Sequence, residues 1–201
     1  MPDKRQVYDR LAAGYDRATG PLERLGLARL RAAALAELPR GASLIEVGAG
    51  TGANFPFYPE GARGACVEPS REMLSRAARK PQRPEGFALV QARAERLPFA
   101  DGAFDAALAT LVFCSVSSPA EAFAELRRVV RSGGVVSLVE HVRPRGLLGL
   151  AFDALSLLTV ALVDDHFNRR TALEAERAGL RVERVEEHLL GVVQRIVCRV
   201  V

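Results

Sequence analysis

The sequence predicts an α/β protein whose core is a doubly wound sheet of seven strands, mostly parallel, with helices on both faces. Along residues 43–141, short runs rich in β-branched residues alternate with helical stretches, which is typical of a parallel sheet. Only a short Leu-Leu-Gly link separates the last two predicted strands, so these two must form an antiparallel hairpin. With 201 residues, the chain can bury one core, and we expect a single domain over residues 1–201.

The individual elements follow from the spacing of apolar residues. Residues Val7–Leu38 have helical spacing and no strand signal, and Pro39-Arg40-Gly41 ends that region. Ser132-Gly133-Gly134 is expected to turn the chain before the fifth strand, and Gly179 to end the last helix. The predicted strands are Ser43–Val47, Gly64–Glu68, Phe87–Ala92, Phe104–Thr110, Val135–His141, Arg181–His188 and Val192–Val200. Helices are predicted at Arg71–Arg79, Pro119–Val130 and Arg169–Ala178.

Composition and charge narrow the classes of function. Apolar residues make up 49% and charged residues 26%, an ordinary globular balance. The net charge of +4 comes from scattered arginines rather than from a basic run, so we expect no nucleic-acid partner. Cys66, Cys114 and Cys198 are widely spaced in apolar surroundings, which indicates buried thiols and no metal site. Because Met1 is followed by a polar stretch, we expect no signal peptide and a cytoplasmic location.

One apolar stretch, Gly146–Val163, is nearly long enough to span a bilayer. It contains Asp153 and two glycines and lies inside what reads as a continuous domain. We therefore expect a buried or interfacial helix rather than a membrane span. Contact with a membrane surface and an ordinary core helix both remain open.

The most informative segment is Leu44–Gly52, in which a predicted strand runs into a glycine-rich turn and a helix is expected to begin. Glycines allow a sharp turn and a close ligand approach, and exposed amides at a helix start attract a negative group. The spacing is G-x-G-x-G, with Ala53 where a dinucleotide fingerprint has its third glycine. The acid Glu46 suits a cationic ligand better than a pyrophosphate. Glu68, at the end of the second strand, is placed to accept ribose hydroxyls.

Four segments in order, EVGAGTG, VEPSREML, ARAERLPFADGAFDAALAT and ELRRVVRSGGVVSLVEH, resemble the class I S-adenosylmethionine (SAM)-dependent methyltransferases. The resemblance covers nearly the whole chain and implies a Rossmann-like fold and SAM as cofactor. Within that superfamily the chain resembles quinone-biosynthesis C-methyltransferases and bacterial phosphatidylethanolamine N-methyltransferases. The segments TLVFCSV, VEHVRP and DDHFNRRT are more similar to methyltransferase-like proteins that methylate thiols or associate with lipid.

The resemblance also implies a cofactor site along the ends of the first four strands. Glu46, Gly48, Ala49, Gly50 and Gly52 would surround the methionine part of SAM, and Glu68 would hold the ribose. The adenine would be bordered by Pro69, Ser70, Met73, Ala94 and Glu95. Thr110 and Leu111 would lie near the sulfonium. Many relatives have an acid where this chain has Arg93. Since arginine cannot accept a hydrogen bond, a backbone carbonyl or a water would have to bind the adenine amino group.

On the acceptor side, His141 is the candidate general base, because ligands of open α/β sheets bind beyond the carboxyl ends of the strands. A structural histidine that bonds a nearby loop is the equal alternative. The resemblance implies a helical cover over residues 1–40, in which Tyr8, Tyr15 and Asp16 lie over SAM, and an acceptor-side helical insertion over residues 145–178. In that insertion a polar cluster, Asp165, His166 and Asn168, either closes the acceptor pocket or caps a helix.

The predicted function is methyl transfer to a small or lipid-like acceptor, with a phospholipid amine, a quinone-like carbon and a thiol all open. Alternatives are a nucleic-acid methyltransferase, a SAM-binding protein without transfer activity and a dehydrogenase. The nucleic-acid alternative fits poorly, because Thr110-Leu-Val-Phe stands where amino-directed enzymes resemble one another in an Asn/Asp-Pro-Pro-aromatic loop. We expect a monomer or a homodimer.

Overall fold

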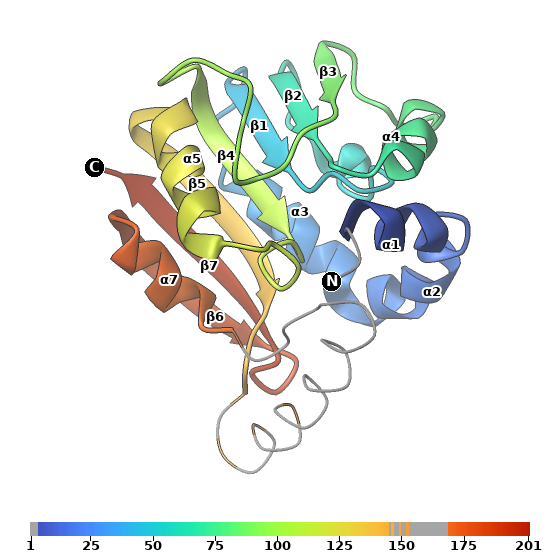
Figure 1. Cartoon of the computed structure of the whole chain (residues 1–201). Coiled ribbons are helices and arrows are strands. Elements are labelled where there is room, and N and C mark those ends of the chain that lie inside the picture. Colours follow the sequence, from blue (N-terminus) through green and yellow to red (C-terminus); the bar gives the residue numbers. More distant parts are fainter. Residues whose placement is uncertain (1–3, 145, 147–148, 150–151, 153–168) are drawn as a thin grey trace.

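The computed structural model describes residues 4–144, 146, 149, 152 and 169–201. Its described strands form one seven-stranded sheet in the order β3-β2-β1-β4-β5-β7-β6 (Figure 1). Strands β1 to β5 run parallel, and β7 lies antiparallel between β5 and β6. The predicted fold class and the C-terminal hairpin are therefore confirmed. The strands are β1 Ser43–Val47, β2 Arg63–Val67, β3 Phe87–Val90, β4 Phe104–Thr110, β5 Val130–His141, β6 Leu180–His188 and β7 Val193–Val200.

Helices cover both faces of this sheet (Figure 1). Helices α3 and α4 pack with the cluster that contains Leu35, Cys66 and Ala77, whereas α5 and α7 pack on the opposite face. The described helices are α1 Lys4–Leu11, α2 Tyr15–Leu22, the π-helix η1 Glu23–Leu27, α3 Ala28–Ala36, the 3-10 helix η2 Phe55–Phe57, α4 Arg71–Ala78, α5 Pro119–Val129 and α7 Thr171–Arg177.

Local sequence signals explain where several helices begin and end. Ser70 caps α4 by accepting the Met73 backbone N–H at 3.1 Å, and Ser118 caps α5 just before a proline in the first turn. Helix α7 ends at Arg177, and Gly179 follows with a φ of +86°, in agreement with the predicted stop.

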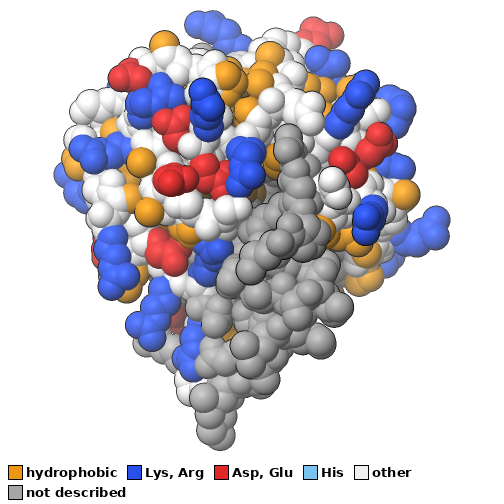
Figure 2. Space-filling model, in the orientation of Figure 1, with side chains coloured by type: hydrophobic (Ala, Val, Ile, Leu, Met, Phe, Trp, Pro, Cys, Tyr) orange, Lys and Arg blue, Asp and Glu red, His pale blue; other side chains and the backbone are white. Residues whose placement is uncertain are grey.

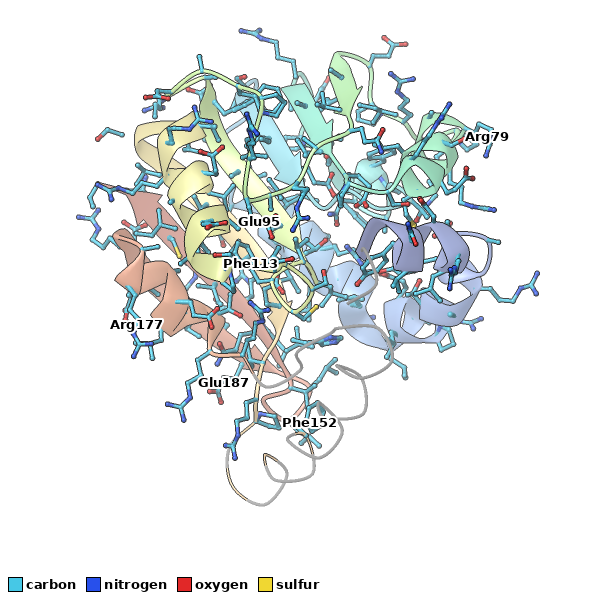
Figure 3. The ribbon with its side chains drawn as sticks, in the orientation of Figure 1. Arg79, Glu95, Phe113, Phe152, Arg177 and Glu187 are labelled. Atoms are coloured by element: carbon cyan, nitrogen blue, oxygen red, sulfur yellow. The ribbon has the colours of Figure 1, made fainter. Side chains whose placement is uncertain are left out.

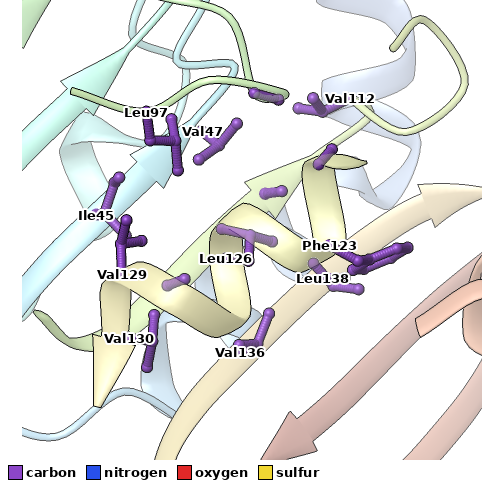
Figure 4. Close-up of a cluster of buried hydrophobic side chains, with 14 of the residues drawn as sticks. Ile45, Val47, Leu97, Val112, Phe123, Leu126, Val129, Val130, Val136 and Leu138 are labelled. Carbon is purple, nitrogen blue, oxygen red and sulfur yellow. The ribbon is translucent and has the colours of Figure 1, made fainter. Parts of the chain in front are cut away.

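The core on the α5 face joins strands from the middle of the sheet to one helix (Figure 4). Ile45 of β1 and Leu138 of β5 lie in one buried cluster with Leu126 of α5. The rings of Phe113 and Phe123 stack with their centroids 4.0 Å apart. Phe113 belongs to the loop that follows β4, so this packing fixes that loop on α5.

The region Val7–Leu38, which has helical spacing, forms several helices, because residues 12–14 interrupt it and Gly26 has a φ of +133° inside η1. The structure corrects two sequence predictions. The predicted turn at Ser132–Gly134 lies inside β5, where Val130 pairs with Phe104 and Val135 with Ala106, so that the residues between them bulge out. Turns and the short η2, rather than an α-helix, follow the glycine-rich segment, because Pro56 lacks the N–H that a longer helix needs.

Charged side chains dominate the outer strand β6. Arg199 pairs with Glu183 at 2.8 Å, and Arg195 pairs with Glu186 at 2.7 Å. On the face shown in Figure 2, basic side chains are interspersed with acidic ones rather than gathered into a stripe. Among the described residues, no helix is long and apolar enough to cross a membrane. Two predictions lie outside the described residues. One is the cluster Asp165, His166 and Asn168, and the other is the helix at Gly146–Val163, of which only Gly146, Gly149 and Phe152 are described.

Candidate functional site

A cavity opens at the carboxyl edge of the parallel strands, where the predicted cofactor residues converge. It encloses about 780 Å³ of empty space, part of which is open to solvent. The predicted residues in its wall are Gly48, Gly50, Glu68, Pro69, Met73, Ala94, Glu95, Thr110 and Leu111. Four predicted residues, Glu46, Ala49, Gly52 and Ser70, lie outside this wall.

The glycine-rich turn has two different reasons for its glycines. Gly48 has a φ of +70°, and a Cβ there would lie only 2.3 Å from Val112 Cγ2. Gly50 has a φ of +55° and faces open space in the cavity wall. The N–H groups of Gly48 and Ala49 donate to the Val67 carbonyl, and that of Gly50 donates to Glu68. These three amides are already bonded within the protein, which argues against the anion site predicted for the turn.

Glu68 is a buried acid in the wall of the cavity. One carboxylate oxygen accepts the Gly50 N–H at 3.0 Å, and the other accepts the Ser70 N–H at 2.9 Å. Burial raises the pKa of Glu68 to about 7, although these two backbone donors lower it. Each oxygen keeps a lone pair for a further donor. A half-satisfied, buried carboxylate of this kind suits a vicinal pair of hydroxyls.

Arg93 and Glu95 form the far wall, beside the loop that follows β4 (Figure 3 labels Glu95). The Arg93 guanidinium donates to Ser117 Oγ at 2.9 Å and pairs with Glu95 at 3.4 Å. Burial raises the pKa of Glu95, but the hydrogen bond from Arg93 and backbone donors outweigh burial and lower it overall. The side chain of Arg93 is thus directed at protein partners, and Glu95 also accepts the Ser117 N–H at 2.8 Å.

A buried polar network lies beneath the glycine-rich turn. Glu46, which is 2% exposed, accepts hydrogen bonds from Asn54 Nδ2 at 2.7 Å and from the Tyr58 hydroxyl. Burial raises the pKa of the Glu46 carboxyl, and these donors together with the charge of Arg31 oppose that rise. Glu46 is therefore held by protein donors and does not line the cavity.

Arg31 extends this network to the end of β4. This guanidinium is 4% exposed and donates to Asn54 Oδ1 at 3.0 Å, to Thr110 Oγ1 at 2.6 Å and to Glu23 at 3.0 Å. Asn54 Nδ2 also donates to Thr110 Oγ1, at 2.9 Å. The Thr110 hydroxyl thus accepts two hydrogen bonds, and its own proton is free to be donated elsewhere. Thr110 also lines the cavity.

The N-terminal helices reach the cavity through two copies of a Tyr-Asp-Arg triplet. Tyr8 of α1 and Tyr15 of α2 line the cavity. Asp9 accepts the Ser70 hydroxyl and, at 3.2 Å, the Glu72 backbone N–H. Asp16 accepts the Thr51 hydroxyl and pairs with Lys80 at 3.2 Å. In each triplet the tyrosine lines the cavity and the aspartate accepts a hydrogen bond from a residue outside the N-terminal helices. We call the contacts of Tyr8, Asp9, Tyr15 and Asp16 the N-terminal clasp.

His141, the candidate base, ends β5 outside the cavity wall. Burial lowers its pKa to about 4, which makes the imidazole a neutral and weak base at pH 7.

The three cysteines are buried, as predicted, and burial raises the pKa of Cys66 and Cys198. Within the described ranges, no cluster of His, Cys, Asp or Glu could hold a metal ion.

Sequence reasoning missed Arg31, Asn54, Asp9 and Glu140. Asp9 had a detectable signal, because the Tyr-Asp-Arg triplet recurs seven residues later. Arg31 had none, since its partner Thr110 is 79 residues away. Glu140 had none either, since this fully buried acid bonds the amides of Val112 and Phe113, which are 28 and 27 residues away in the sequence.

The strand order β3-β2-β1-β4-β5-β7-β6, in which parallel strands are followed by an antiparallel hairpin, is that of the Rossmann-like methyltransferase fold. Comparison with known families agrees: the methyltransferase domain matches residues 45–138. The phosphatidylethanolamine N-methyltransferase of Cereibacter sphaeroides is 33% identical over 152 residues, which cover 74% of this chain and 73% of that protein. The chain belongs to the class I SAM-dependent methyltransferases, and the cofactor that this family implies is SAM.

Two further comparisons extend this result. The thiol S-methyltransferase TMT1B of Mus musculus is 34% identical over 143 residues, covering 68% of this chain and 59% of that protein. The chain thus spans little more than half the length of this relative. A solved structure described as a possible histamine N-methyltransferase from Thermotoga maritima has a TM-score of 0.74 at 22% identity, covering 98% of this chain and 99% of that one. This likeness concerns the fold.

The residues of the cavity fit the cofactor. Glu68 offers two buried acceptor positions for ribose hydroxyls, and Gly50 leaves the space beside it open. Met73 and Ala94 give apolar surface to the same wall, which suits a flat aromatic base. Thr110 and Leu111 line the part of the wall at the end of β4.

Proposed function

We propose that the protein transfers the methyl group of SAM to a small or lipid-like acceptor, and that the acceptor is a thiol. The observation that supports transfer is the shape of the cavity, in which one wall holds Glu68 and another is the loop after β4. A nucleoside bound at Glu68 leaves the Thr110 and Leu111 end for the reacting groups. Contact with a membrane surface and the oligomeric state remain expectations from the sequence.

The weak basicity of His141, the candidate base, favours an acceptor that loses its proton readily. When bound, the cofactor supplies a methyl group already activated by a positively charged sulfur, so the protein mainly holds and aligns the acceptor. A general base is needed only for an acceptor that arrives protonated. His141, with a pKa of about 4, accepts a proton poorly. A thiol with a pKa of about 8.5 ionises without help near neutral pH, whereas an alkylammonium with a pKa of about 10 does not.

The reaction balances without another reactant. The acceptor sulfur forms a bond to the methyl carbon as the bond from that carbon to the sulfonium breaks, and the thiol proton goes to water. The products are a methyl thioether and S-adenosylhomocysteine. The similarity to a thiol S-methyltransferase supports the same acceptor class.

Transfer of radiolabelled methyl groups tests this proposal. Purified protein with labelled SAM would be offered 2-mercaptoethanol, phosphatidylethanolamine vesicles, a hydroquinone and RNA, between pH 6 and 9. We expect label in the thiol, at a rate that rises with pH. Label in phospholipid, hydroquinone or RNA instead would reassign the acceptor. A melting temperature raised by S-adenosylhomocysteine but no transfer to any of them would identify a SAM-binding protein without transfer activity.

A further inference from the structure

The loop that follows β4 has an unusual backbone at the cavity wall. Leu111 has a φ of +58°, a left-handed conformation that costs a residue with a side chain about 1 kcal/mol or more. Its N–H donates to the Val139 carbonyl at 2.7 Å. The next residue, Val112, packs so closely on Gly48 that no Cβ would fit there. Something outside the loop must hold this conformation.

A buried carboxylate provides that restraint. Glu140 is fully buried in β5, and its two oxygens accept the Val112 N–H at 3.0 Å and the Phe113 N–H at 3.1 Å. Burial raises the pKa of Glu140 to about 8, while backbone donors and the charge of Arg169 lower it. Glu140 does not line the cavity. It therefore acts on the loop rather than on a ligand.

A cation holds the other end of the same loop. Arg169 Nη2 donates to the Val116 carbonyl at 2.8 Å. Between the two restraints, Ser115 and Val116 donate their N–H groups back to the Val112 carbonyl, which closes a tight turn. The Glu140 carboxyl group thus binds two amides at the start of this turn, and the Arg169 guanidinium binds the Val116 carbonyl at its end.

The loop held in this way forms one wall of the site. Leu111, Val112, Ser115 and Val116 line the cavity between Thr110 and the Arg93 side. The Arg143 N–H donates to the Arg169 carbonyl at 3.4 Å, so the residues that flank residues 145–168 in sequence meet beside this loop. A displacement of Glu140 or Arg169 would shift the wall without touching Glu68.

We propose that Glu140 and Arg169 are positioning residues for methyl transfer, which hold residues 111–116 against the glycine-rich turn so that the acceptor meets the cofactor in line. This inference rests on the proposed function. It separates the site into a nucleoside end, which Glu68 would bind, and a reacting end, which Glu140 and Arg169 would keep rigid. A shift of about 1 Å at a reacting centre is enough to lower a rate about 100-fold.

The test compares Glu140→Gln with Glu140→Asp and Arg169→Met. The glutamine offers one acceptor and turns its NH₂ group toward a backbone donor, whereas the aspartate keeps both acceptors. For Glu140→Gln we expect at least a tenfold lower kcat with 2-mercaptoethanol, a Kd for S-adenosylhomocysteine within threefold of wild type, and partial recovery in Glu140→Asp. The double variant Glu140→Gln, Arg169→Met should be no slower than the worse single variant.

Amide hydrogen exchange decides the question independently of any acceptor. In Glu140→Gln, the amides of Val112 and Phe113 should exchange at least tenfold faster, while those of β1 keep their protection. Wild-type kcat together with unchanged exchange at these amides would overturn the positioning role. If wild-type protein methylates none of the offered acceptors, the proposed function fails, and the exchange experiment still judges Glu140. If Glu140→Gln does not fold, Arg169→Met and Glu140→Asp carry the same comparison.

Discussion

The two ends of the cavity are built in different ways. At the nucleoside end, Glu68 contacts Ser70 two residues away and Gly50 eighteen residues away. At the reacting end, Thr110 depends on Arg31, 79 residues away, and the loop after β4 depends on Glu140 and Arg169. The residues around Glu68 lie in short sequence motifs, whereas those around Thr110 come from distant parts of the chain and meet only in the tertiary fold. Nucleoside binding and acceptor alignment should therefore be separable by mutation.

The largest effect is expected at the buried network. Arg31→Met removes the donor to Glu23 and to Asn54 Oδ1, removes one of the two donors to Thr110 Oγ1, and removes the positive charge that lowers the pKa of Glu46. Removing one partner of a buried ionic network costs about 3–5 kcal/mol. Urea unfolding would measure this loss against Arg29→Met, an exposed arginine on the same helix whose removal should cost about 0.5 kcal/mol or less. Equal losses in both variants would show that the network is not structural.

The nucleoside end should be disrupted by Glu68→Gln. An amide replaces a carboxylate that is placed to accept two ribose hydroxyls, and hydrogen bonds to charged groups contribute about 1.5–3 kcal/mol each. We expect S-adenosylhomocysteine to bind about 100-fold more weakly by calorimetry, a loss of about 2.7 kcal/mol. The exposed Glu72→Gln on α4 is the control and should bind normally. Normal binding by Glu68→Gln would place the ribose elsewhere.

The pH dependence of stability distinguishes the buried acids. Burial raises the pKa of Glu140 to about 8 and that of Glu68 to about 7, from 4.5. The fold favours the protonated form of each acid. The free energy of unfolding is therefore highest below pH 4.5, and it falls as the pH rises from 4.5 toward 7 for Glu68 and toward 8 for Glu140. Each acid contributes a slope of up to about 1.4 kcal/mol per pH unit in that window. Denaturant unfolding of Glu140→Gln should show a shallower slope than wild type; an identical slope would mean that Glu140 ionises normally.

The smallest effect is expected in the N-terminal clasp. Asp9→Asn and Asp16→Asn each weaken a charged hydrogen bond to a loop behind the cavity, at a cost of about 1 kcal/mol. Because Tyr8 and Tyr15 line the cavity, we expect S-adenosylhomocysteine to dissociate about fivefold faster in stopped-flow experiments. The exposed Arg10→Gln serves as a control. Unchanged dissociation rates in both aspartate variants would separate the clasp from cofactor retention.

The fold was predictable to the extent that its signals were local. Short strand-forming runs between helical stretches located β1 and β4 at their observed bounds, and the short Leu-Leu-Gly link predicted the antiparallel hairpin. The bulge in β5 was missed because Ser132-Gly133-Gly134 has the composition of a turn, and only pairing with Phe104 continues the strand through it. The roles assigned to individual cofactor residues stay predictions. The partners of Thr110 could not be predicted, because no periodicity connects it to Arg31.

The charged strand β6 has a consequence for how copies of the protein meet. A strand at the edge of a sheet exposes free N–H and C=O groups that can pair with another chain. Here Glu183 and Glu186 are paired with arginines of β7, and any strand added beside β6 would have to bury part of these ion pairs. The opposite edge, β3, has only the residues Phe87–Val90 to offer. Both margins of the sheet thus discourage sheet-to-sheet aggregation at high protein concentration.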